Sequence, residues 1–187
     1  MSRKSSKRAT RKPRRTGRKT AAGRRAPARP APAGRRAVRP IPEGHPAVSP
    51  YIIVEDASRA LEFYKKAFGA RELMRHTAPD GKIGHAEIRI ADSVIMLADE
   101  HPEVDARSPR AYGGTPVSLH LYVTDVDAVA RQAIEAGATV VRPVQDQFYG
   151  DRNGTLADPF GHQWHLSTHI EDVSPAELRR RAAEAGR

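Results

Sequence analysis

The chain has 187 residues, a formal net charge of +10 and no cysteine, which excludes disulfide bonds, thiolate metal sites and a cysteine nucleophile. Residues 1–40 hold 16 of the 32 lysine and arginine residues and none of the 22 aspartate and glutamate residues, so the remaining 147 residues are acidic overall. No apolar run approaches the roughly 18 residues of a membrane span, and no apolar stretch of a signal peptide follows the basic N-terminus. We therefore expect a cytoplasmic protein without a membrane partner.

Residues 1–45 are rich in Lys, Arg, Ala, Pro and Gly, and we predict a disordered basic tail because they have too little apolar surface to fold. Its one-signed charge favours non-specific, salt-dependent binding of DNA or RNA through residues 1–40. The alternative is a solvated linker with no partner. The candidate nucleic-acid contacts are the paired arginines, Arg14, Arg15, Arg24, Arg25, Arg35 and Arg36.

A globular domain is predicted over residues 46–187, and its first half spans about 47–100. A strand rich in Tyr, Ile and Val at 49–54 is followed by Asp56, a good N-cap, and by a helix that ends at Gly69. Three further strands are predicted at 73–77, 84–90 and 94–98, the first two joined by an Asp-Gly hairpin turn. A polar loop covers residues 99–115.

The second half, at about 116–170, repeats the order of the first. Residues 117–125 overlay residues 48–56, and a helix and strands at 139–144, 155–157 and 163–168 follow. The alternatives are a true duplication or a chance likeness within one eight-stranded domain, and we favour duplication. The predicted fold class is α+β, with paired βαβββ modules forming a curved eight-stranded mixed sheet. Ser174, Pro175 and Glu177 form a capping box that opens a C-terminal helix at about 175–185.

Several segments resemble one family. The helix at 60–70 and the stretches at 149–152 and 158–164 are similar to signatures of the glyoxalase/bleomycin-resistance/dioxygenase (vicinal oxygen chelate, VOC) superfamily. Residues 169–175 resemble the ending of its bacterial glyoxalase-like, or 3-demethylubiquinone-methyltransferase-like, subgroup. The resemblance covers roughly residues 47–180 and implies the paired-module fold and a homodimer. It leaves the activity open, because one scaffold hosts many chemistries.

The resemblance also implies positions for a metal centre, since metal-dependent members hold a divalent ion with four His and Glu side chains. Those positions fall on Ser49, Met96, Ser118 and His165, of which only His165 is a good ligand. The complete family metal site is therefore not expected. The alternative is a shifted divalent metal site formed by Glu87, His120 and His165, or histidines that only line or pack a pocket. Whether the protein is an enzyme stays open; if it is, we expect a metal-dependent lyase, isomerase or dioxygenase.

The leading hypothesis is a protein that binds a small organic molecule in the concavity between its two halves. A metal-dependent enzyme and a nucleic-acid-associated accessory protein are the alternatives. Arg152 presents a planar fork for a ligand carboxylate or phosphate, or else forms a surface pair with Asp151. Trp164 is expected in the core, and His162 is expected to close a turn. The pocket candidates are Tyr51, His120, Tyr122, Tyr149, Arg152, Gln163 and His165.

Overall fold

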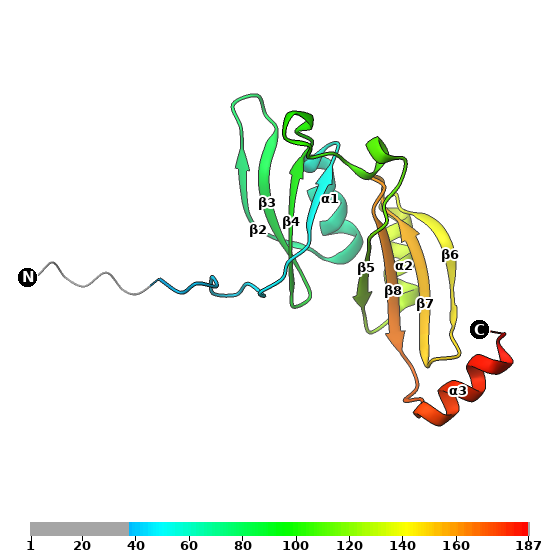
Figure 1. Ribbon diagram of the computed structural model, residues 1–187. Helices are drawn as coiled ribbons and strands as arrows, with labels where there is room; N and C mark the ends of the chain where they lie inside the picture. Colours follow the sequence, from blue (N-terminus) through cyan, green and yellow to red (C-terminus); the bar gives the residue numbers. More distant parts are fainter. Residues whose placement is uncertain (1–37, 187) are drawn as a thin grey trace, which may run out of the picture. The chain divides into compact units, whose positions relative to one another are not determined.

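The computed structural model describes residues 38–186, in which the two predicted βαβββ modules are present (Figure 1). The first module contains β1 (Tyr51–Val54), α1 (Ala57–Phe68), β2 (Arg71–Thr77), β3 (Ile83–Ile90) and β4 (Ser93–Asp99). The second contains β5 (Ser118–Tyr122), α2 (Val126–Glu135), β6 (Thr139–Asp146), β7 (Asp151–Ala157) and β8 (Gln163–His169), followed by α3 (Pro175–Glu184). None of the helices in the described part of the chain is long and apolar enough to cross a membrane.

The candidate nucleic-acid contacts lie outside the described residues, as does most of the predicted tail at 1–45. These contacts are Arg14, Arg15, Arg24, Arg25, Arg35 and Arg36. Nucleic-acid binding through the tail therefore stays a prediction.

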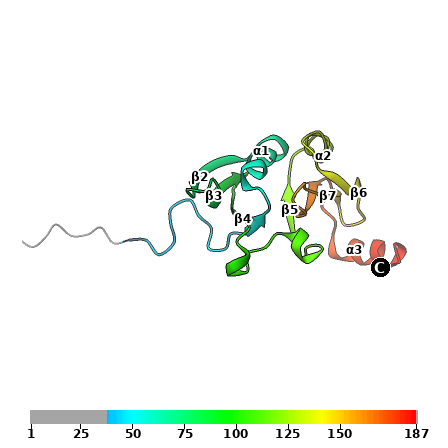
Figure 2. The same ribbon diagram turned by 90° about the horizontal axis from the view of Figure 1, so that it is seen from above.

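The eight strands form two four-stranded mixed sheets, in the orders β1-β4-β3-β2 and β5-β8-β7-β6. The pairs β1–β4 and β5–β8 are parallel, and all other strand pairs are antiparallel. The expected eight-stranded sheet is thus divided in two, because β1 and β5 do not pair with each other. The modules are joined through their helices and turns instead, and α1 and α2 cover the same side of the two sheets (Figure 2).

The internal duplication predicted from the sequence is confirmed residue by residue. Tyr51 lies opposite Met96 in the first sheet, and His120 lies opposite His165 in the second. Each residue of the second pair follows its counterpart in the first by 69 positions. The N-caps follow the same rule, since the carboxylate of Asp56 accepts from the backbone of α1 and that of Asp125 from the backbone of α2. The modules therefore share their local hydrogen bonding as well as their topology.

The core lies between the sheets and the helices and continues across the joint between the modules. The joint centres on the buried carboxylate of Asp158, which accepts hydrogen bonds from the hydroxyl of Tyr64 in α1 at 2.7 Å and the indole of Trp164 in β8 at 3.0 Å. Its other oxygen accepts from the backbone of Phe160 and His162 in the turn before β8. Both carboxylate oxygens are thus hydrogen-bonded, as a buried charge requires. The bond from Tyr64 of the first module to Asp158 of the second joins the two modules.

Polar side chains complete the joint at its rim. Gln132 of α2 donates to the last carbonyls of α1, and Arg110 donates to the carbonyl of Pro159. The ring of His162 bonds the carbonyl of Ile53 at 2.9 Å, on the free edge of β1. His162 therefore belongs to a turn, as expected, and also links the two modules.

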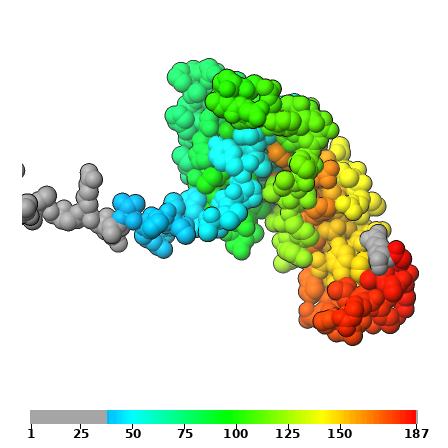
Figure 3. Space-filling view, in the orientation of Figure 1, coloured from blue at the N-terminus to red at the C-terminus, as the bar shows by residue number. Residues whose placement is uncertain are grey.

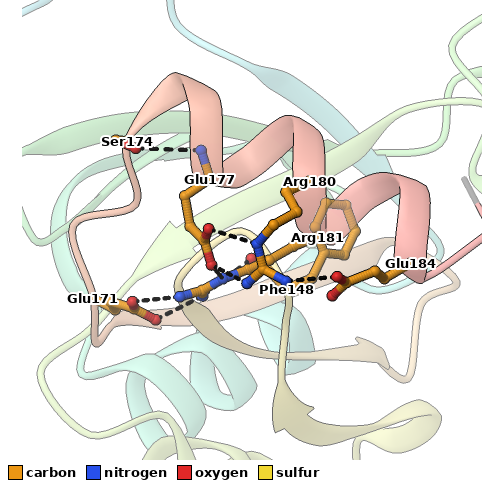
Figure 4. Close-up of polar contacts among 7 residues, drawn as sticks. All are labelled: Phe148, Glu171, Ser174, Glu177, Arg180, Arg181 and Glu184. Atoms are coloured by element: carbon orange, nitrogen blue, oxygen red, sulfur yellow. Dashed lines mark hydrogen bonds and ion pairs between the residues drawn. The ribbon is translucent and has the colours of Figure 1, made fainter.

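The predicted C-terminal helix is confirmed, and an ionic network binds it to the second module (Figure 4). The hydroxyl of Ser174 accepts from the backbone of Glu177, which is one half of the predicted capping box, while the Glu177 carboxylate binds arginines. Arg181 pairs with Glu177 and with Glu171, which follows β8. Arg180 forms a second pair with Glu177, and the two guanidinium groups lower the pKa of the Glu177 carboxyl to about 2.

Candidate functional site

The candidate site is the face of the second sheet that α2 does not cover. The strand pairing sets out one polar row across all four strands: Arg142 opposes Thr155, Thr155 opposes His165, and His165 opposes His120. Residues directly opposite each other in a sheet point to the same face, so these four side chains form one line. We call this set, Arg142, Thr155, His165 and His120, the polar row.

Two adjacent histidines occupy the β8 and β5 positions of the polar row. The ring centroids of His120 and His165 are 6.0 Å apart, and Nδ1 of His165 lies 2.9 Å from the hydroxyl of Thr155. Burial lowers the pKa of His165, and the nearby charges of Arg142 and His120 lower it further. A neutral imidazole at pH 7 can donate or accept a hydrogen bond, depending on its tautomer.

Irregularities in β6 place Arg142 in this row. Val140 opposes Leu156 while Arg142 opposes Thr155, so an extra residue lies between them and turns Arg142 onto the open face. A second register shift separates Arg142 from Gln145, and there Gly154 packs tightly on Val144: a Cβ atom at Gly154 would lie 2.7 Å from the Val144 side chain. Arg142 was not predicted from the sequence, because simple alternation puts it on the same face as Val140. The signal in the sequence was Pro143, which inside a strand marks an edge or a bulge.

A second polar group adjoins the row. The hydroxyl of Tyr122 donates to Asp151 at 2.9 Å, and Nδ1 of His169 lies 2.8 Å from the other oxygen of that carboxylate. These contacts raise the pKa of both Tyr122 and His169. The ring of Tyr122 also lies 4.7 Å from that of His120. The structure thus brings together three predicted pocket residues, His120, Tyr122 and His165.

A hollow of about 440 Å³ lies beside the free edge of β5, between the second module and the β3–β4 hairpin of the first (Figure 3). His120 and Tyr122 line it from the open face, and Leu119 and Leu121 line it from the strand edge. The opposite wall is mostly apolar and includes Pro46, Val48, Pro50, Val94 and Ile95. The polar row therefore ends at an apolar recess.

The open side of the first sheet carries a separate cluster around Glu87. Its carboxylate lies 2.8 Å from the ring of His45 and 3.4 Å from that of His85, and His85 lies 3.0 Å from the hydroxyl of Tyr51. The contact with His45 lowers the pKa of Glu87 and raises that of His45. Glu87 and Tyr51 are thus engaged on a different sheet from His120 and His165.

The remaining pocket candidates differ in position. Gln163 lies one row away from His165 in β8, opposite Ser118, and Tyr149 lines a small hollow of about 110 Å³ with Arg142. Arg152 lies in β7, and its guanidinium binds Asp127 of α2 through two bonds and Asp146 through a third. The structure therefore places Arg152 on the helix side of the sheet, away from the polar row, and the expected pair with Asp151 is replaced by these contacts. Trp164 is buried in the core, as predicted.

A family model for the Glyoxalase/Bleomycin resistance protein/Dioxygenase superfamily matches residues 44–166. The chain belongs to this superfamily. An uncharacterized protein of Mycobacterium bovis is 46% identical over 141 residues, which cover 74% of this chain and 93% of that protein. The crystal structure of TioX from Micromonospora sp. ML1 is 26% identical, with a TM-score of 0.53 over 69% of this chain and 100% of that one. A PhnB protein from Bacillus cereus, 18% identical, with a TM-score of 0.52 over 66% of this chain and 99% of that one, shares the fold.

The donor set of this superfamily member does not fit the metal centre that the family resemblance implies. The four implied positions hold two hydroxyls, a thioether and one imidazole, on Ser49, Ser118, Met96 and His165, and such a set binds Zn²⁺ or Fe²⁺ weakly. Nor do three His, Asp or Glu side chains converge in metal-binding geometry anywhere between residues 38 and 186. The alternative site of Glu87, His120 and His165 is not formed by the described residues either. Glu87 lies in the first sheet, where it contacts His45, whereas His120 and His165 lie in the second.

Proposed function

We propose that this superfamily member binds a small organic molecule in the concavity between its modules, without the full metal site of the family. The polar row forms one wall, and the hollow beside β5 receives the apolar part of the ligand. The observation that carries the proposal is the alignment of His120 and His165 on an uncovered sheet face next to a recess of about 440 Å³. Pockets of this size with a few convergent polar groups are typical of small-molecule sites.

The site chemistry supports binding through hydrogen bonds. His165 is neutral at pH 7 because its pKa is lowered, and the hydroxyl of Thr155 lies close to its Nδ1. Tyr122 adds a hydroxyl at the edge of the hollow. The imidazole of His165 is half-buried, and within residues 38–186 its Nε2 forms no hydrogen bond, which favours molecules that donate or accept at that atom.

The test is a thermal-shift screen of the full-length protein, treated with a chelator, against a library of small polar organic compounds. A compound at 100 times its Kd stabilises the native state by about 2.7 kcal/mol, which corresponds to a rise in Tm of roughly 5 to 11 °C for a domain of this size. We expect such compounds to be found, and we expect the shift to be lost in His120→Gln and His165→Gln.

The matched control is His101→Gln, the same chemical change at a histidine outside both sheets. Its Tm shifts should equal those of the wild type. The proposal is wrong if no compound raises the Tm, or if the shifts persist in a protein that carries both substitutions in the polar row.

A further inference from the structure

Resting on the proposed function, we infer that the ligand is an organic carboxylate with an apolar body, and that Arg142 binds its carboxylate group. The two ends of the polar row indicate this class of ligand. One end carries a cation, and the other end opens into an apolar recess.

Among the strand arginines of residues 38–186, Arg142 and Arg71 have neither a carboxylate partner nor a hydrogen bond, and of these two only Arg142 belongs to the polar row. Arg152 binds Asp127 and Asp146, and Arg75 binds Glu72. Arg89 donates to backbone carbonyls. Within residues 38–186, by contrast, no carboxylate forms an ion pair with Arg142, although the bulge in β6 directs this residue to the open face. Bulges are common at sheet edges and next to active sites, where they redirect a side chain, and this one turns an unpaired cation toward the polar row.

The surroundings of Arg142 match a single carboxylate. The guanidinium is a planar fork that binds a carboxylate through two parallel hydrogen bonds. The amide side chain of Gln145 lines the same small hollow and can donate to a carboxylate oxygen, whereas the amide of Asn153 already donates to Leu166 and Ser167. His165 is neutral at pH 7, so this end of the row offers one full positive charge, which suits a monocarboxylate better than a phosphate dianion.

The length of the row defines the rest of the ligand. Adjacent strands lie about 4.8 Å apart, so the three steps from β6 through β7 and β8 to β5 span roughly 14 Å. A molecule anchored at Arg142 therefore passes over His165 and His120 and reaches the recess lined by Leu119 and Leu121. Burial of its apolar end there adds affinity in proportion to the area removed from water.

The experiment compares an acid with its neutral amide by NMR titration of the full-length, ¹⁵N-labelled protein. The probes are 8-phenyloctanoate, which is long enough to span the row, 8-phenyloctanamide and inorganic phosphate. The reporters are the backbone amides of Arg142, Thr155, His165 and His120. We expect 8-phenyloctanoate to shift these signals with a Kd at least tenfold lower than that of 8-phenyloctanamide. Arg142→Gln should remove the difference between the two probes, whereas Arg142→Lys should keep part of it, because the charge remains but the fork is lost.

The matched control is Arg131→Gln, which makes the same change in charge at an exposed position on α2, on the other side of the sheet. It should behave as the wild type. Equal affinity for the acid and the amide, or an unchanged preference in Arg142→Gln, would overturn the carboxylate assignment and leave the proposed binding face intact. Tighter binding of phosphate than of 8-phenyloctanoate would overturn it too. If neither organic probe shifts the row, the inference is wrong, and the thermal-shift screen decides the proposed function separately.

Discussion

Removal of one hydroxyl at the joint between the modules should destabilise the whole domain. In Tyr64→Phe the aromatic ring stays, and only the hydrogen bond from the hydroxyl to Asp158, 2.7 Å long, is lost. Tyr64 is fully buried, so no water replaces the missing donor. A hydrogen bond to a charged group contributes about 1.5–3 kcal/mol, and we expect the free energy of unfolding to fall by that amount.

Tyr122→Phe is the matched control, because it also removes a tyrosine hydroxyl that donates to an aspartate. Tyr122 is 59% exposed, so water can take the place of its hydroxyl beside Asp151, which is buried but keeps its contact with His169. The expected loss is therefore below about 1 kcal/mol. Both variants are compared with the wild type by urea unfolding at pH 7. The free energies of unfolding are comparable when the m-values of the three proteins are equal. Equal losses in the two variants, or a loss below about 0.5 kcal/mol in Tyr64→Phe, would refute the reasoning that burial of the Asp158 cluster joins the modules.

Gly154→Ala should lower the free energy of unfolding by about 1–3 kcal/mol, measured by urea unfolding, because its Cβ would overlap Val144; an unchanged stability would contradict the tight bulge in β6. The carboxyl of Glu177 should titrate in ¹³C NMR with a pKa of about 2 instead of 4.5, so the ionic attachment of α3 is complete above pH 4.5 and is lost as the pH falls toward 2. A normal pKa in the wild type would contradict the network of Figure 4. Full-length protein should bind duplex DNA in a gel shift at 50 mM salt and lose roughly 10³-fold or more in affinity at 200 mM, and a variant lacking residues 1–37 should not bind; binding that survives the truncation would remove the tail from this role.

The sequence predicted the modules well because local signals and the repeat agreed. Asp56 and Asp125 mark the helix starts, and apolar alternation marks the strands that pack on the helices. The division into two sheets was missed because edge-to-edge pairing of β1 and β5 depends on how the modules pack. That packing is set by the Asp158 cluster, whose members come from distant parts of the chain.

The candidate site was predicted in part. Alternation within β5 and β8 correctly placed His120 and His165 on one face, since neither strand is bulged along the pairing. The same rule fails in β6, where the register shifts move Arg142, and it could not foresee that β7 begins early enough to include Arg152. Contacts between sequence-distant side chains, such as Glu87 with His45, also require the tertiary structure.

The most direct test of a binding site that works without a metal is calorimetric titration of a compound from the screen into untagged protein, with and without a chelator, together with metal analysis of the purified protein. We predict the same Kd in both conditions, less than stoichiometric metal, and loss of binding in His165→Gln. A stoichiometric divalent ion that disappears in His165→Ala, with ligand binding that the chelator abolishes, would contradict the account.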